Sequence, residues 1–138
     1  TVSSKSNWER VQNIRSLIGM SRIVILCASH DVGQDPIIGV SEIDHLKGKY
    51  FVNTARGELV DEQSLLAAIR NNAFAGVGVD VVTNENSGAN LEEWRSLLPG
   101  RNVVLTPHIA GATFESMKKT EMFIAKKLLD AMNLGDIR

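Results

Sequence analysis

Short apolar segments alternate with segments of helical periodicity along this chain, and this alternation constrains its fold more than any other feature. The expected strands are residues 23–27, 50–53, 76–82 and 103–105. The expected helices are residues 8–19, 41–46, 61–71, 91–97 and 114–134. Strands that alternate with helices favour a parallel sheet. The sequence therefore predicts an α/β fold in which helices cover both faces of a parallel sheet.

The first expected strand is an uninterrupted apolar run, Ile23-Val24-Ile25-Leu26-Cys27. Such a run predicts a strand that is buried on both faces of its sheet. Helix ends are indicated by residues that commonly cap helices. Asp61 is expected to begin a helix, Asn71 to close it and Gly135 to end the last helix of the chain.

Composition excludes several classes of protein. The chain has 138 residues, a formal net charge of -1 and no basic run, so nucleic acid is not an expected partner. Its apolar runs are far shorter than the roughly 20 residues of a membrane span, and no signal peptide is recognisable. Cys27 is the single cysteine, which fits a reducing compartment and a cytoplasmic location. We expect one domain with neither a membrane partner nor a metal centre.

Three charged or titratable residues follow the ends of expected strands. Arg56 follows the second strand, Glu85 the third and His108 the fourth. In open parallel sheets, ligands bind beyond the carboxyl ends of the strands. We therefore expect Arg56, Glu85 and His108 to meet at one edge of the sheet and to form a catalytic centre.

The chemistry of these three residues suits the reduction of a 2-keto acid. The planar guanidinium of Arg56 can bind a carboxylate through two hydrogen bonds. His108 can give a proton to a developing alkoxide and take it back in the reverse reaction. A carboxylate such as Glu85 beside an imidazole favours the protonated ring and orients it. Taken singly, the three also fit ordinary roles: a surface salt bridge, a structural histidine and a solvated loop acid.

The third expected strand carries two further features. Asp80 ends this apolar strand, where an acid must find partners or water, and an amide group of a cofactor is one candidate. Gly76-x-Gly78 superficially resembles the start of a dinucleotide-binding loop. Val81 stands where the third glycine would be, and the pair lies inside a strand. We therefore expect these glycines to let neighbouring elements pack closely.

Three blocks of the sequence resemble the D-isomer-specific 2-hydroxyacid dehydrogenases. They are residues 46–61 with Asn53-Thr54-Ala55-Arg56-Gly57, residues 76–80 followed by Glu85, and residues 102–113 with Thr106-Pro107-His108. Their order and spacing match the family, and the resemblance covers about residues 22–134, with the first 20 residues only weakly similar. It implies a Rossmann-type NAD-binding fold and hydride transfer between NAD(H) and a small 2-hydroxy or 2-keto acid.

The resemblance also implies a role for each matching residue. Arg56 would bind the substrate carboxylate, His108 would be the acid/base, and Glu85 would be its partner. Asp80 would meet the nicotinamide amide. The other cofactor-binding residues would be Thr54, Ala55, Ala110 and Gly111 beside the nicotinamide, and Cys27 and Ala28 near the adenine-side ribose. NAD is the expected cofactor, and NADP stays open because the ribose-reading residues of the family have no counterpart in the three blocks.

The chain departs from the family pattern in two residues and in extent. Ala28 and Asn86 stand where the family usually has proline. The family's glycine-rich phosphate loop lies upstream of the matching blocks, so residues 1–138 are expected to be the C-terminal portion of the NAD-binding domain, without the phosphate loop and the substrate domain. Such a portion is expected to bind NAD poorly and to self-associate through strand 23–27, in line with a homo-oligomer. The alternative function is a corepressor-like, NAD-sensing binding protein on the same fold.

Overall fold

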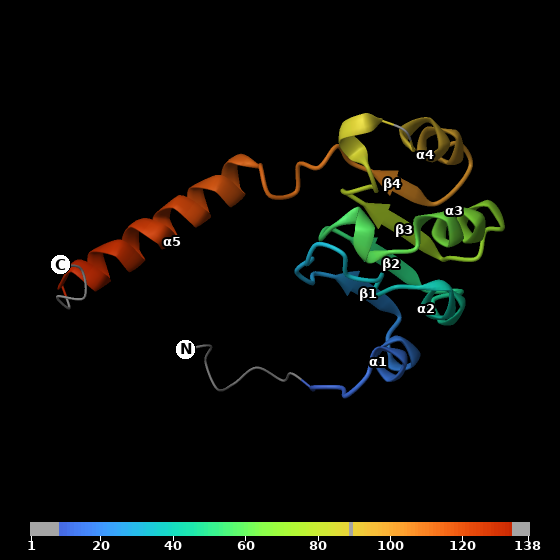
Figure 1. Ribbon diagram of the computed structural model, residues 1–138, viewed down its shortest axis with the longest axis horizontal. Helices are drawn as coiled ribbons and strands as arrows, with labels where there is room; N and C mark the ends of the chain where they lie inside the picture. Colours follow the sequence, from blue (N-terminus) through green and yellow to red (C-terminus); the bar gives the residue numbers. More distant parts are fainter. Residues whose placement is uncertain (1–8, 89, 134–138) are drawn as a thin grey trace. The chain divides into compact units, whose positions relative to one another are not determined.

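The structure is a computed structural model that describes residues 9–88 and 90–133. The chain divides after Leu105 into two compact units, each described by itself. The first unit contains a parallel sheet and four α-helices, and the second contains one long helix (Figure 1). The predicted end of that helix at Gly135 lies outside the described residues. In the part of the chain that the structure describes, no helix is both long enough and apolar enough to span a membrane.

The sheet has four parallel strands in the order β1-β2-β3-β4. Their bounds are β1 (Ile23–Leu26), β2 (Tyr50–Asn53), β3 (Gly76–Val79) and β4 (Val103–Leu105). This arrangement confirms the predicted α/β class and parallel sheet. The prediction that the third strand continues to Val82 is wrong, because its pairing with β2 ends at Val79. The backbone leaves the ladder after a last hydrogen bond from the N–H of Asp80 to Asn53, although Asp80 and the two residues after it remain buried.

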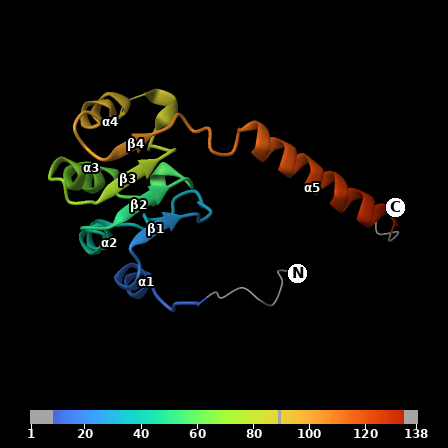
Figure 2. The same cartoon turned by 180° about the vertical axis from the view of Figure 1, so that it is seen from behind.

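The helices of the first unit form a layer on one face of the sheet (Figures 1 and 2). They are α1 (Ile14–Met20), α2 (Val40–His45), α3 (Glu62–Arg70) and α4 (Leu91–Leu97), with 3-10 turns η1 (Gly57–Leu59) and η2 (Glu85–Ser87). Each connection joins neighbouring parallel strands in the same direction across the sheet. Because such connections are right-handed, their helices pack on the same face. The predicted helix layer is therefore present on this face of the first unit.

The core lies between this helix layer and the sheet. Val24 and Leu26 of β1 are buried, whereas Ile23 and Ile25 are 56% and 59% exposed. The prediction that residues 23–27 are buried on both faces of the sheet is therefore wrong for this structure. Within the first unit the helices pack on one face of the sheet, and alternate side chains of a strand point to opposite faces.

The glycines of β3 lie inside the strand, as the sequence predicts. A Cβ atom on Gly76 would lie 2.7 Å from Asn102 Nδ2 and 2.9 Å from Tyr50 Cδ1. Gly76 therefore permits the close packing that the sequence suggests, whereas a Cβ on Gly78 would make only ordinary contacts. The pair belongs to a strand and not to a phosphate-binding turn.

Capping residues set the ends of α3 where the sequence predicts them. The carboxylate of Asp61 accepts a hydrogen bond from the backbone N–H of Ser64 at 3.0 Å. Asn71 is the C-cap, and Asn72 follows in the left-handed region with φ of 51°. Both ends of this helix are therefore fixed by local sequence, and its N-terminal cap lies close along the chain to Arg56.

We expect Asp61→Ala to lower the free energy of unfolding by about 1 kcal/mol, because it removes the cap of α3 and leaves the Ser64 N–H without that acceptor. Urea unfolding followed by circular dichroism would measure the loss. Gln63→Ala changes an exposed residue of the same helix and should stay within about 0.5 kcal/mol of the parent. Equal stability of the Asp61→Ala protein and the parent would show that this cap is not stabilising.

Candidate active site

All four strands end in one row. Leu26 pairs with Asn53, Asn53 with Val79, and Val79 with Leu105. Neighbouring strands of a sheet lie about 4.8 Å apart, so the segments that follow these residues leave the sheet side by side. The carboxyl ends of the strands therefore form one continuous edge, which is where parallel sheets bind ligands.

Several of the predicted cofactor-binding residues come directly after this row. Cys27 and Thr54 are exposed, Ala28 is half-buried against the core, and Ala55 is buried. Asp80 is only 5% exposed, and its backbone N–H donates to the carbonyl of Asn53 at 3.0 Å. The edge thus presents small side chains beside a buried carboxylate.

The backbone of Arg56 is held by the side chain of Asn53. Asn53 is 2% exposed; its Nδ2 donates to the carbonyl of Arg56 at 2.9 Å, and its Oδ1 accepts from the N–H of Ala55 at 3.0 Å. The guanidinium of Arg56 donates through Nη1 to the carbonyl of Ala55 at 2.7 Å. Arg56 itself is exposed, so a well-fixed backbone presents a guanidinium at the surface.

Gly57 brings the segment of Arg56 against the segment that leads to Glu85. A Cβ atom at Gly57 would overlap with the backbone of Val82 and Thr83. No other residue type could occupy this position without moving one of the two backbones. The structure therefore brings Arg56 and the start of the Glu85 segment together within the first unit.

Glu85 begins a short 3-10 turn that two left-handed residues enclose. Asn84 before it has φ of 54°, and Gly88 after it has φ of 67°. The N–H of Ser87 donates to the carbonyl of Asn84 at 2.9 Å, and the N–H of Gly88 donates to that of Glu85 at 3.2 Å. This polar segment is thus a defined turn with Glu85 exposed on it.

His108 lies three residues beyond the end of β4, in the second unit. Its φ of 53° places a residue other than glycine in the left-handed region. Such conformations are uncommon and cluster at functional sites. The predicted turn at Ala110 and Gly111 follows, and then α5 (Phe114–Asn133) begins. Because His108 belongs to one unit and Arg56 and Glu85 to the other, their convergence stays a prediction.

The structure also identifies supporting residues that the sequence analysis missed. Asn53 reads simply as the last residue of a strand, and Glu62 as a polar residue next to a helix cap. Glu62 is 9% exposed and accepts hydrogen bonds from the backbone N–H of Thr83 at 3.0 Å and from the indole N–H of Trp94 at 2.9 Å. The available signals were an asparagine at a strand end and an acid in the first turn of a helix. Neither signal identifies the group to which the side chain will hydrogen-bond.

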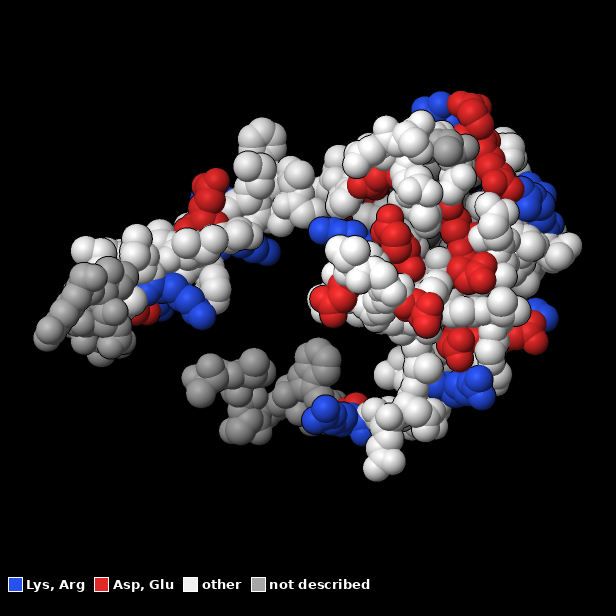
Figure 3. Space-filling model, in the orientation of Figure 1, with Lys and Arg blue, Asp and Glu red and all other residues white. Residues whose placement is uncertain are grey.

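Charge is unevenly distributed over the face of the first unit shown in Figure 3. Acidic side chains gather across its middle, and basic side chains lie at its margins. The chain as a whole has a formal net charge of -1. Binding of a small anion would therefore depend on a nearby cation such as Arg56 and not on a positive electrostatic field of the whole chain.

Comparisons with known proteins agree with the predicted fold and family. A family model for the D-isomer specific 2-hydroxyacid dehydrogenase, NAD binding domain, matches residues 2–110. The match begins well before residue 22, so the first part of the chain resembles the family more than the three sequence blocks suggest. It also agrees with NAD as the predicted cofactor.

Two similar proteins are named for reactions of hydroxy or keto acids. D-3-phosphoglycerate dehydrogenase of Escherichia coli is 33% identical over 131 residues, which are 94% of this chain and 32% of the relative. 4-Methyl-2-oxopentanoate reductase A of Aspergillus oryzae is 33% identical over 120 residues, 86% of this chain and 35% of the relative.

A solved structure with the same fold contains both a cofactor and an acid. D-Lactate dehydrogenase of Aquifex aeolicus, complexed with NAD and lactic acid, superposes with a TM-score of 0.68 at 28% identity, over 88% of this chain and 40% of that one. The chain spans about a third of the length of the curated relatives it matches. It belongs to the D-isomer specific 2-hydroxyacid dehydrogenase family and matches that family in its NAD-binding domain.

Proposed function

We propose that the protein interconverts small 2-keto acids and D-2-hydroxy acids with NAD(H), and that this chain supplies Arg56, Glu85 and His108 to the reaction. The observation that carries the proposal is the contact of Gly57 with Val82 and Thr83 at the carboxyl edge of the sheet. It brings a guanidinium and the segment of a carboxylate together where parallel sheets bind ligands. Membership of the family supplies the class of reaction.

The buried carboxylate of Asp80 and the small residues beside it support cofactor binding. Asp80 can accept a hydrogen bond from the amide of a nicotinamide, and Thr54 and Ala55 leave room for the ring at the edge. Cys27 and Ala28 follow the neighbouring strand β1 and would lie on the adenine side. When bound, NADH supplies the hydride that reduces the keto carbon.

In the proposed reaction, Arg56 binds the substrate carboxylate and so orients the adjacent carbonyl. The fork of guanidinium donors suits a carboxylate better than the single ammonium of lysine does. His108 donates a proton to the carbonyl oxygen during reduction and accepts it during oxidation. Glu85 holds the ring of His108 in the orientation that proton transfer requires. Ala110 and Gly111 complete the nicotinamide side.

The names of the similar proteins limit the substrate to a class. Phosphoglycerate, lactic acid and 4-methyl-2-oxopentanoate all have a carboxylate next to a hydroxyl or keto carbon, but their remaining groups differ. We therefore propose a small 2-hydroxy or 2-keto acid and no particular member of the class. The predicted homo-oligomer and the cytoplasmic location stay predictions.

We expect Arg56→Lys in the full-length protein to lower kcat/KM for a 2-keto acid by roughly 30-fold or more. A loss of that size corresponds to about 2 kcal/mol for the charge-assisted hydrogen bonds of the guanidinium fork. Steady-state oxidation of NADH at 340 nm would measure it across a series of small 2-keto acids. Arg95→Ala removes an exposed arginine that is paired with Glu92, and it should leave kcat/KM unchanged. Full activity of Arg56→Lys would contradict carboxylate binding by this residue.

We expect His108→Asn to lower kcat by about 100-fold or more, since it removes the general acid and base. Asparagine tolerates the left-handed backbone of this position, so the loss can be assigned to the imidazole. Turnover and NADH fluorescence titration would be measured together, and NADH affinity should be retained. His45→Asn is the matched control, because His45 is exposed on α2 and bonds only locally to the carbonyl of Ser41.

The same measurements separate the enzyme from its alternative. NADH binding by the parent protein with no turnover of any small 2-keto acid would overturn the proposed activity. It would favour the corepressor-like, NAD-sensing protein instead.

A further inference from the structure

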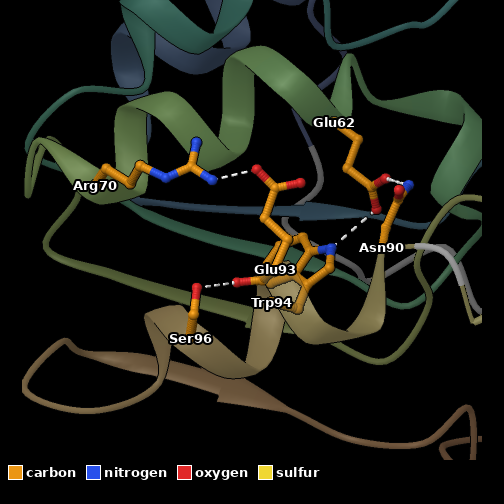
Figure 4. Close-up of polar contacts among 6 residues, drawn as sticks. All are labelled: Glu62, Arg70, Asn90, Glu93, Trp94 and Ser96. Carbon is orange, nitrogen blue, oxygen red and sulfur yellow. Dashed lines mark hydrogen bonds and ion pairs between the residues drawn. The ribbon is translucent and has the colours of Figure 1, made fainter.

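One buried carboxylate holds both ends of the segment that carries Glu85. Glu62 Oε1 accepts from the backbone N–H of Thr83 at 3.0 Å, and its Oε2 accepts from the side-chain amide of Asn90. The indole N–H of Trp94 donates to Oε1 at 2.9 Å (Figure 4). Thr83 stands just before the turn of Glu85 and Asn90 just after it. Asn90 Nδ2 also donates to the carbonyl of Thr83 at 3.4 Å, so Glu62 and Asn90 together close the segment at its base.

The hydrogen bonds of Glu62 all run toward its carboxylate oxygens. A carboxylate only accepts hydrogen bonds, and all three of these partners are donors. Glu62 is also the first residue of α3, where the helix dipole favours a negative charge. With glutamine at this position, the amide oxygen could still accept from Thr83 and Trp94, but its NH₂ would face the side-chain NH₂ of Asn90. The Asn90 amide also donates to the carbonyl of Thr83 at 3.4 Å, and it would lose that bond if it turned over. Burial makes that mismatch costly, because water cannot easily replace the lost partner.

The internal geometry of the segment is set by short-range bonds, but its position is not. The turn of Glu85 is fixed by the hydrogen bonds of Ser87 and Gly88 to the residues before them. Those bonds move with the turn, so they cannot fix where Glu85 lies relative to the sheet. The attachment of the segment at Thr83 can fix that position. Thr83 also contacts Gly57, which lies beside Arg56.

We propose that Glu62 is a positioning residue, which holds the Glu85 segment so that Glu85 can pair with the acid/base imidazole. This inference rests on the proposed function. Glu62 is nine-tenths buried and holds Thr83 at the start of the Glu85 segment, so it acts through Glu85. Its role is distinct from simple packing of α3 on α4, for which the ion pair of Arg70 with Glu93 provides a comparison (Figure 4).

A double-mutant cycle tests this role in the full-length protein. Glu62→Gln should lower kcat for a 2-keto acid by at least about 10-fold, while KM and NADH affinity stay within about 3-fold. In a Glu85→Gln protein, adding Glu62→Gln should lower kcat by less than about 3-fold, because Glu62 would have little left to position. A residue that only stabilises the fold would lower the melting temperature and leave kcat of the folded protein unchanged in both backgrounds.

Glu93→Gln is the matched control, since it makes the same chemical change on α4 and breaks the exposed ion pair with Arg70. It should leave kcat unchanged. If Glu62→Gln does not fold, Asn90→Ser can be tested in its place. It removes one anchor of the segment at a half-buried site. It should lower kcat in the same direction by a smaller factor, again without further loss in the Glu85→Gln background.

The outcomes separate this inference from the proposed function. An active parent with unchanged kcat in Glu62→Gln, or with fully additive losses in the double variant, overturns the role of Glu62 alone. An equal loss in Glu93→Gln also overturns it, because the effect would then come from packing of α3 on α4. A parent that turns over no 2-keto acid refutes the proposed function, and the positioning role fails with it.

Discussion

Leu26, Asn53, Val79 and Leu105 are partners across four parallel strands, so the segments that follow them must leave the sheet at one edge. This register is the constraint on which the candidate site depends. A shift of one residue in one strand would turn alternate side chains to the opposite face of the sheet. The buried positions of Val24, Leu26 and Phe51 oppose such a shift, since each would lose its place in the core.

Two buried polar side chains fix the geometry of the segments at this edge. Asn53 holds the backbone before Arg56, and Glu62 holds the backbone before Glu85. Both lie among apolar residues, where an unpaired polar group costs about 1–3 kcal/mol. Their partners are therefore kept in place by the cost of separating them. Gly57 then lets the two supported segments touch.

The exposed groups of the candidate site and the buried groups that support them have different roles. Arg56 and Glu85 are at the surface, where a ligand can reach them, whereas the groups that hold their backbones are in the interior. A guanidinium on an unsupported loop would lose more conformational entropy when it binds an acid.

The sequence by itself determined the strands at residues 50–53 and 103–105, the caps of α3, and the motifs that carry Arg56, Glu85 and His108. These are local properties, because periodicity and capping depend on residues a few positions apart. Only the tertiary structure decided that Glu62 binds Thr83 and Trp94, that Gly57 touches Val82, and that one face of β1 is exposed. The hydrogen bonds of Glu62 join residues 21 and 32 positions apart, and no local pattern specifies which distant donor a buried acid will meet.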